Sequence, residues 1–272
     1  MKTSLIITTY NRPDALALVL ESAFEQVVLP DEILVADDGS RSETADLCRE
    51  MAAQSPVPLI HCWQEDKGFR LARVRNLAIS RCIGEYIVMI DGDMILNENF
   101  VKDHVTFSKK SCFAQGSRVL ISKEKTQDAL VNSNWKFGFF SAGISNRMNA
   151  LRSSFLRWML SGMKEKIEGV RGANMAFWKN DVELVNGFNE EFVGWGREDS
   201  EFVVRLFNSG VKRRNLKFGA VAFHLFHGSD NKDNTSEFLT ENEDLLKKAQ
   251  ERKLKRCYFG LESHNKKSNR NH

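Results

Sequence analysis

Two pairs of carboxylates stand out because of where they lie relative to predicted strands and helices. Asp91 and Asp93 directly follow the apolar run 86–90, and carboxylates two residues apart can hold a divalent cation together with phosphate oxygens. An ordinary Asp-Gly turn is the alternative interpretation. Glu198 and Asp199 follow a Gly-Trp-Gly-Arg sequence and begin a predicted helix, whose dipole favours charged carboxylates at its N-terminus.

One tryptophan and two histidines extend this set of candidate site residues. Trp195 lies between two glycines and offers a flat apolar surface of the kind that stacks on a sugar ring, although a plain glycine-bounded loop is the alternative. His224 lies near the end of the apolar run 219–226, and His227 lies just beyond it. Neutral imidazole is a common ligand of Mn²⁺-like ions, so Asp93 with either histidine would make a cation site. A packed core histidine is the alternative.

Three arginines lie between Asp38 and Asp91 in the sequence. Arg70, Arg73 and Arg75 could pair with phosphates. For Arg73 and Arg75, however, the solvated face of a helix is the favoured interpretation.

Alternating strands and helices are predicted over the first 120 residues. Strand-like runs cover residues 4–10, 32–36, 59–63 and 86–90. Helices are expected after Pro13, after a Ser40–Glu43 capping box, and over residues 71–82. This alternation predicts an α/β fold with a mostly parallel central sheet flanked by helices. Ligands of such sheets bind beyond the carboxyl ends of the strands, where the sequence places these polar residues: Thr8, Tyr10, Asp37, Asp38, Asp91 and Asp93.

The rest of the chain breaks this alternation and then resumes it. Residues 122–168 form an insertion rich in basic and aromatic residues. Beyond it we expect a strand over 172–177, a short helix capped by Asn180, a helix ending near residue 208, and a last strand over 219–226. We therefore divide the chain into a domain over 1–228, with a first half (1–121), the insertion (122–168) and a second half (169–228), and a basic helical or flexible tail over 229–272.

Charge and composition exclude several classes of protein. The 272 residues carry a net charge of +3, but residues 247–272 hold nine Lys or Arg against two Glu. The remaining globule is slightly acidic, which argues against a nucleic-acid partner. No apolar stretch approaches the roughly 18 residues of a transmembrane helix, and the start does not resemble a signal peptide. Five scattered cysteines indicate buried thiols and a cytoplasmic location.

Several motifs resemble family-2 glycosyltransferases of the GT-A fold, a Rossmann-like nucleotide-sugar-binding fold. The resemblance in the first half rests on these segments: Thr8–Arg12, Val35–Ser40, Arg75–Ala78, and Gly84–Ile87 leading to Asp91-Gly92-Asp93. In the second half, Gly172–Phe177 and Gly194–Asp199 resemble the β-1,4-galactosyltransferase and chondroitin-polymerase-like group.

The resemblance implies that residues 1–121 form a nucleotide-binding half and residues 169–228 an acceptor and catalytic half, and it implies a role for each matching residue. Thr8, Tyr10 and Asp38 match positions that hold the uracil and ribose of a nucleotide sugar, Arg70 a base- or phosphate-contacting arginine, and Asp91 a ribose contact. Asp93 matches a ligand of Mn²⁺ or Mg²⁺ in a DXD motif, and His224 or His227 matches a second ligand. Asp199 matches the catalytic base, while Glu198, together with Trp195, would bind the acceptor. Ser200 departs from the pattern, because an acidic residue is usual there.

These roles imply a metal-dependent, inverting hexosyltransferase. It would move a sugar from a UDP-hexose or UDP-N-acetylhexosamine to a hydroxyl of a glycan or glycolipid acceptor, in the synthesis of lipopolysaccharide, capsule or another surface polysaccharide. The basic tail and the aromatic insertion could bring it to an anionic membrane as a peripheral protein of the inner face. The alternatives are a non-catalytic nucleotide-sugar-binding or membrane-surface protein and a sugar-phosphate nucleotidylyltransferase. The latter fits less well, because residues 9–13 contain no glycine to form a phosphate loop.

Overall fold

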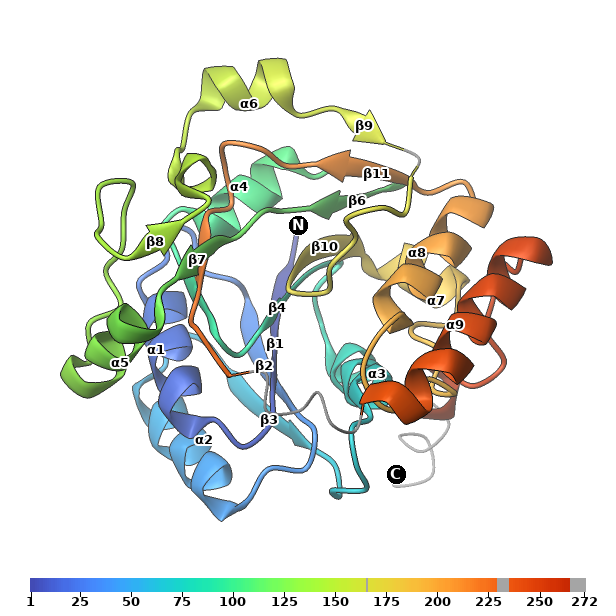
Figure 1. Ribbon diagram of the computed structural model, residues 1–272, viewed down its shortest axis with the longest axis horizontal. Helices are drawn as coiled ribbons and strands as arrows, with labels where there is room; N and C mark the ends of the chain where they lie inside the picture. Colours follow the sequence, from blue (N-terminus) through green and yellow to red (C-terminus); the bar gives the residue numbers. More distant parts are fainter. Residues whose placement is uncertain (165, 229–234, 265–272) are drawn as a thin grey trace.

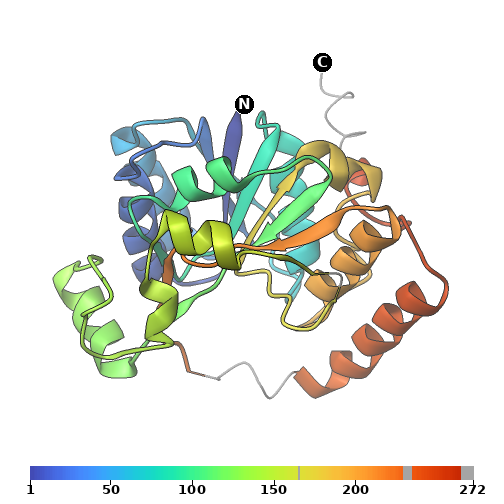
Figure 2. The same ribbon diagram turned by 90° about the horizontal axis from the view of Figure 1, so that it is seen from above.

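A twisted sheet with helices on both faces forms the centre of the molecule (Figures 1 and 2). The computed structural model describes residues 1–164, 166–228 and 235–264. Within them the main sheet has the strand order β3-β2-β1-β4-β10-β6-β11-β9, and a smaller sheet has the order β5-β12-β7-β8. The strands are β1 Thr3–Thr9, β2 Glu32–Asp37, β3 Leu59–Trp63, β4 Tyr86–Asp91, β5 Met94–Leu96, β6 Cys112–Gln115, β7 Val119–Ile121, β8 Ile144–Ser145, β9 Met163–Lys164, β10 Asn174–Trp178, β11 Lys212–Asn215 and β12 Ala222–His224.

The helices alternate with the strands through the first half, as the sequence predicts. They are α1 Pro13–Phe24, α2 Ser42–Gln54, α3 Leu71–Arg81, α4 Phe100–Phe107, α5 Lys123–Asn132, α6 Ser154–Leu160, α7 Lys179–Leu184, α8 Glu198–Asn208 and α9 Thr235–Glu251, with a 3₁₀ turn over Arg147–Ala150. Strands β1, β2, β3 and β4 pair in parallel, whereas β10 runs antiparallel to β4 and β6. The predicted α/β fold with a mostly parallel sheet is therefore confirmed.

Alternation along each central strand divides the core between the two faces of the sheet. In β1, Leu5 and Ile7 pack with α1 and α2, while Ile6 packs with α3 and α8 on the other face. Both faces are covered, so these strands are apolar along their whole length. Their carboxyl ends are the polar edge that positions the site.

Three local details differ from the sequence prediction. Helix α2 begins at Ser42 rather than after a Ser40 cap, because the Ser40 hydroxyl accepts a hydrogen bond from the backbone N–H of Asn11 at 2.8 Å. Helix α7 begins at Lys179, so Asn180 lies inside the helix and is not its cap. The last strand is only Ala222–His224, because the chain still turns at Ala220, whose φ is +45°.

The basic, aromatic segment is more ordered than its composition indicates. It contains α5, the 3₁₀ turn and α6, and buried Asp103 of α4 ties it to the core. The guanidinium of Arg152 donates two hydrogen bonds of 2.9 Å to that carboxylate, and Arg157 pairs with it at 2.5 Å. Both guanidiniums are therefore directed toward α4, while the apolar side chains of Phe155, Trp158, Met159 and Leu160 on α6 are exposed.

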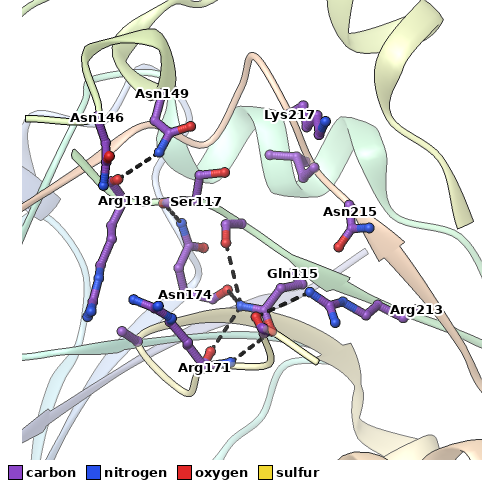
Figure 3. Close-up of a pocket in the computed structure, with 14 residues that line it drawn as sticks. Gln115, Ser117, Arg118, Asn146, Asn149, Arg171, Asn174, Arg213, Asn215 and Lys217 are labelled. Atoms are coloured by element: carbon purple, nitrogen blue, oxygen red, sulfur yellow. Dashed lines mark hydrogen bonds between the residues drawn. The ribbon is translucent and has the colours of Figure 1, made fainter. Parts of the chain in front are cut away.

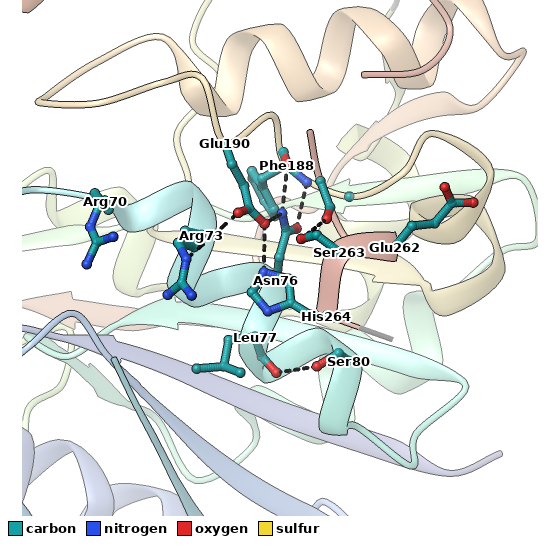
Figure 4. Close-up of polar contacts among 12 residues, drawn as sticks. Arg70, Arg73, Asn76, Leu77, Ser80, Phe188, Glu190, Glu262, Ser263 and His264 are labelled. Atoms are coloured by element: carbon teal, nitrogen blue, oxygen red, sulfur yellow. Dashed lines mark hydrogen bonds and ion pairs between the residues drawn. The ribbon is translucent and has the colours of Figure 1, made fainter. Parts of the chain in front are cut away.

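The C-terminal segment packs against the domain through the loop that follows α7. Asn186 accepts a hydrogen bond from the backbone N–H of Leu261 at 2.9 Å, and Leu261 is 2% exposed within the core. His264 contacts Glu190 at 2.7 Å, and Glu190 in turn accepts a hydrogen bond from Asn76 of α3 (Figure 4). Residues 229–234 and 265–272 of the predicted tail lie outside the described residues. No helix in the described ranges combines the length and hydropathy needed to cross a bilayer.

Candidate active site

The Asp91-Gly92-Asp93 turn is fastened to the end of β1. The Thr8 hydroxyl donates a hydrogen bond to the Asp91 carboxylate at 3.0 Å, and the Gly92 N–H donates to the Thr8 carbonyl at 2.6 Å. A Cβ on Gly92 would lie 2.8 Å from that carbonyl oxygen, so only glycine fits this close approach. These contacts constrain the turn more than an ordinary Asp-Gly turn, and they fix the orientation of its two carboxylates.

Asp93 lies at the centre of a cluster of possible metal ligands. Its Oδ2 is 3.5 Å from His224 Nε2, 3.6 Å from His227 Nε2 and 3.7 Å from Arg12 Nη1. One ligand atom from each of Asp93, His224 and His227 lies within 4.8 Å of the others. The structure thus brings both predicted histidines to Asp93, and the choice between them stays open.

The chemistry of this donor set fits a divalent cation. Burial, with a contribution from Asp91, raises the pKa of Asp93 to about 6, and burial together with nearby Arg118 lowers the pKa of His224 to about 3. His224 is therefore a neutral imidazole, the form that ligates metals. The buried Oδ1 of Asp93 has no hydrogen-bond partner within the described part of the chain. A cation such as Mn²⁺ would satisfy that oxygen and offset the cost of the buried carboxylate.

Arg75 is a central residue that sequence reasoning placed wrongly. It is 1% exposed, not on a solvated helix face, and its guanidinium lies 3.6 Å from Asp91 and 3.1 Å from Glu198. It also lies over the Phe188 ring at 5.2 Å. The guanidinium is already paired with carboxylates, so it links the two acidic motifs. Arg73 is partly exposed and contacts Gln64.

Glu198 and Asp199 begin α8, as predicted, and differ in their surroundings. Burial and the neighbouring Asp199 raise the pKa of Glu198 to about 7. Asp199 Oδ2 accepts a hydrogen bond from the Gly172 N–H at 2.9 Å, which fixes the carboxylate in place. Trp195 precedes the helix and is 60% exposed, so its ring is open to a ligand.

The predicted nucleotide contacts gather at the ends of β1 and β2. The Asp38 carboxylate is buried and accepts hydrogen bonds from the Arg70 backbone N–H at 2.8 Å and from Gln64 at 2.5 Å. Tyr10 is 42% exposed, and its hydroxyl donates to Asp66 at 3.1 Å. The structure joins Asp38 to the backbone of Arg70, whereas the Arg70 side chain donates to the Glu65 carbonyl. The nucleotide-binding roles of these residues stay predictions.

A basic cleft beside these motifs was missed in the sequence (Figure 3). It has a volume of about 310 Å³ and lies among the β6–β7 connection, the loop before β10 and the end of β11. Its lining includes Arg118, Arg171, Arg213 and Lys217. These residues come from separate segments with no shared motif, so no local pattern could have grouped them.

Comparison with solved structures shows which class of protein has this fold. The S. aureus TarS fragment 1–349 in complex with UDP-GlcNAc matches 90% of this chain and 65% of its own, with 19% identity and a TM-score of 0.61. A mannosyltransferase from Pyrobaculum calidifontis, PcManGT, in complex with GDP-Man and Mn²⁺, matches 85% of this chain and 58% of its own, with 17% identity and a TM-score of 0.54. The fold is that of the GT-A glycosyltransferases.

Sequence comparison gives the family. Residues 4–162 match the model of glycosyl transferase family 2, and residues 155–228 match a model described as the N-terminal domain of galactosyltransferase. The first match covers more than half of the chain, which therefore belongs to glycosyl transferase family 2.

Two curated relatives are considerably longer than this chain. The chondroitin synthase of Escherichia coli is 29% identical over 241 residues, which are 81% of this chain and 34% of the relative. The hyaluronan synthase of Pasteurella multocida is 28% identical over 238 residues, which are 81% of this chain and 24% of the relative. This chain thus spans a quarter to a third of the length of these relatives.

Proposed function

We propose that this protein is a metal-dependent, inverting glycosyltransferase that moves a hexose or N-acetylhexosamine from a UDP-sugar to a hydroxyl of a glycan acceptor. One observation carries the proposal. The Asp93–His224–His227 cluster and the Asp199 carboxylate belong to one connected edge of the fold, because Arg75 pairs with both Asp91 and Glu198. A single displacement requires a cation site for the leaving diphosphate and a carboxylate that accepts the proton of the acceptor hydroxyl.

The residues of this site divide the chemical work. Asp199, held by the Gly172 N–H, accepts the proton of the acceptor hydroxyl as that oxygen attacks the anomeric carbon from the face opposite the diphosphate. The bond to the diphosphate breaks in the same displacement, so the anomeric configuration inverts. A cation held by Asp93 and the histidines would supply Lewis-acid stabilisation of the leaving diphosphate. Asp38 and Tyr10 would hold the nucleotide, and Trp195 and Glu198 the acceptor.

Incubation with a panel of UDP-sugars, Mn²⁺ or Mg²⁺ and glycan acceptors tests this function. We expect UDP release that depends on the acceptor and stops with EDTA, and a product of inverted configuration by NMR. Transfer that is unaffected by EDTA would contradict the metal assignment. UDP binding without transfer or hydrolysis for any acceptor would favour the alternative of a non-catalytic nucleotide-sugar-binding protein.

The acceptor class and the place of action are a finer proposal. Relatives named chondroitin synthase and hyaluronan synthase support a role in polysaccharide synthesis, such as that of capsule or lipopolysaccharide. Helix α6 supports peripheral attachment to an anionic membrane surface, since Phe155 and Trp158 are 65% and 79% exposed there. The arginines of this segment contribute less positive charge to such a surface than their number indicates, because Arg152 and Arg157 are paired with Asp103.

Sedimentation with anionic liposomes tests the membrane part. We expect the protein to bind at low salt and Trp158→Ser to bind more weakly. Trp63→Ser is the control, because Trp63 lies in β3 at the edge of the main sheet opposite β9, and it should bind as the unmodified protein does. Absence of sedimentation at low salt would overturn this part and leave the transferase proposal standing.

A further inference from the structure

The basic cleft has four cationic side chains and no carboxylate among its lining residues. Arg118 and Asn149 lie on one side of it, and Arg213 and Asn215 on the other (Figure 3). The remaining polar surface consists mainly of amides and backbone, which hydrogen-bond without adding charge. The cleft is therefore positive, although the globule around it is slightly acidic.

The cations of the cleft differ from three arginines elsewhere in this protein, because they form no close ion pair among the described residues. Arg75, Arg157 and Arg205 each pair with a carboxylate at 3.1 Å or less. By contrast, Arg118, Arg171 and Lys217 form no ion pair within residues 1–164, 166–228 and 235–264, although Asp91 and Asp93 are near enough to act on the charge of Arg118.

Like charges also face each other here. Burial and Arg171 lower the pKa of Arg118 against the opposing charges of Asp91 and Asp93, and the Arg118 Nε is buried without a hydrogen-bond partner in the described chain. Arg213 has another task, since its guanidinium donates to the carbonyls of Lys166 and Glu168 and so holds one wall in place. Arg171 and Lys217 have no carboxylate at ion-pair distance in the described chain, and clustered cations of this kind are costly unless an anion binds among them.

The position of the cleft assigns that anion to the acceptor side of the site. Arg171 directly precedes Gly172, whose N–H holds Asp199, the proposed base. The predicted nucleotide contacts Asp38 and Tyr10 belong instead to the ends of β2 and β1, and Arg118 is the cleft residue on which Asp91 and Asp93 of the donor side act. An acceptor that presents its hydroxyl to Asp199 would therefore extend along Arg171 toward Lys217.

We propose that this cleft binds an anionic group, a carboxylate or a phosphate, on the acceptor glycan, with Arg171 and Lys217 as its recognition residues. That the bound glycan is an acceptor rests on the proposed transferase function, whereas the binding of an anion in the cleft does not. Guanidinium and ammonium groups recognise such anions through charge-assisted hydrogen bonds. A neutral sugar of the same shape would leave the cations unpaired, so the cleft would discriminate against it.

Three methyl β-glycosides that share one ring test the proposal directly: the glucoside, the glucuronide and the glucoside 6-phosphate. Binding is measured by saturation-transfer NMR titration with UDP and Mn²⁺ present and no donor sugar, so turnover is not needed. We expect the two anionic glycosides to bind roughly tenfold or more tightly than the glucoside, which corresponds to about one charge-assisted hydrogen bond. The order of the two anions identifies which group the cleft prefers.

A matched pair of double variants locates the effect. In Arg171→Gln/Lys217→Gln the preference for the anionic glycosides should disappear. Lys2→Gln/Arg252→Gln removes the same charge from exposed positions outside the cleft and should keep the preference. Melting temperatures of both variants check that each is folded.

Two results would overturn the proposal. One is equal binding of the neutral and anionic glycosides to the unmodified protein. The other is a loss of UDP affinity in Arg171→Gln/Lys217→Gln with the anion preference unchanged, since these cations would then serve the donor diphosphate. Anion binding at Arg171 and Lys217 without any sugar transfer would instead contradict the proposed function alone.

Discussion

The acidic strand-end motifs and the basic cleft lie side by side, and they differ in how their charges are balanced. At the acidic motifs, Arg75 is paired with Asp91 and Glu198, and Asp93 has Arg12 and two histidines around it. In the cleft, Arg171 and Lys217 form no ion pair among the described residues, and Arg118 has only the more distant Asp91 and Asp93 as counter-charges. The charges of the first region are balanced within the protein, whereas the proposed ligand would balance those of Arg171 and Lys217 in the second. Substitutions at the acidic motifs should therefore affect stability as well as turnover.

Asp199→Asn should give the largest loss of activity. The amide keeps the size of the side chain and its contact with the Gly172 N–H, but it cannot accept the acceptor's proton. We expect the rate of UDP release to fall by about 10²–10⁴-fold with UDP affinity unchanged. Asp181→Asn on α7 makes the same chemical change away from the site and should keep full turnover. An Asp199→Asn enzyme that turns over normally would show that another group is the base.

Arg75→Met should have the largest effect on stability. It removes the cation from two carboxylates, one of them 12% exposed, and breaking a buried pair in this way costs about 3–5 kcal/mol. Chemical denaturation measures this loss, and UDP release below the melting transition measures activity.

Arg205→Met is the matched control, because Arg205 is fully buried and pairs with Glu201 elsewhere on α8. We expect it to lose stability but to keep its activity while folded. Equal activity losses in the two variants would mean that Arg75 supports the fold and has no particular link to the site.

The comparison between the two regions also shows what the sequence could predict. Asp91, Asp93 and Asp38 were identifiable because each follows a strongly apolar strand, and parallel strands end at a common edge. His224 was found through its own strand and the family resemblance. The apolar strand before each residue and the family motif around it are both local signals, so each can be found in a single stretch of sequence.

Arg75 and the cleft depend on contacts that no single stretch contains. Arg75 lies between Val74 and Asn76, and its burial is decided by Asp91, Gly172 and Glu198, the last 123 positions away. From the sequence, the solvated face of a helix is the favoured interpretation for it. The cleft needs β6, β10 and β11 to be neighbours in the sheet, and that order does not follow the sequence.

Gly172→Ala tests the junction between the two regions. A Cβ at this position would lie 2.5 Å from Arg75 Nη2, and the guanidinium cannot easily move away because two carboxylates hold it. Overpacking of this kind costs about 1–3 kcal/mol, which should appear as a lower melting temperature together with reduced turnover. Gly138→Ala adds the same methyl group where nothing lies within 4 Å, and it should change neither quantity. A fully stable, active Gly172→Ala enzyme would mean that Arg75 is not rigidly held.

Glu198→Gln should have the smallest effect, visible as a pH dependence of stability. Burial and Asp199 raise the pKa of Glu198 from 4.5 to about 7 against the opposing effect of Arg75, while Asp91 raises it further. The unfolded chain loses this proton near pH 4.5, but the folded protein keeps it until about pH 7, so rising pH lowers the stability of the unmodified protein across this window. The glutamine variant has no such proton to lose. Its melting temperature relative to the unmodified protein should therefore increase between pH 5 and pH 8, whereas that of Glu183→Gln, an exposed control, should stay level. A constant difference for Glu198→Gln would show that this carboxylate is already charged in the folded protein at pH 5.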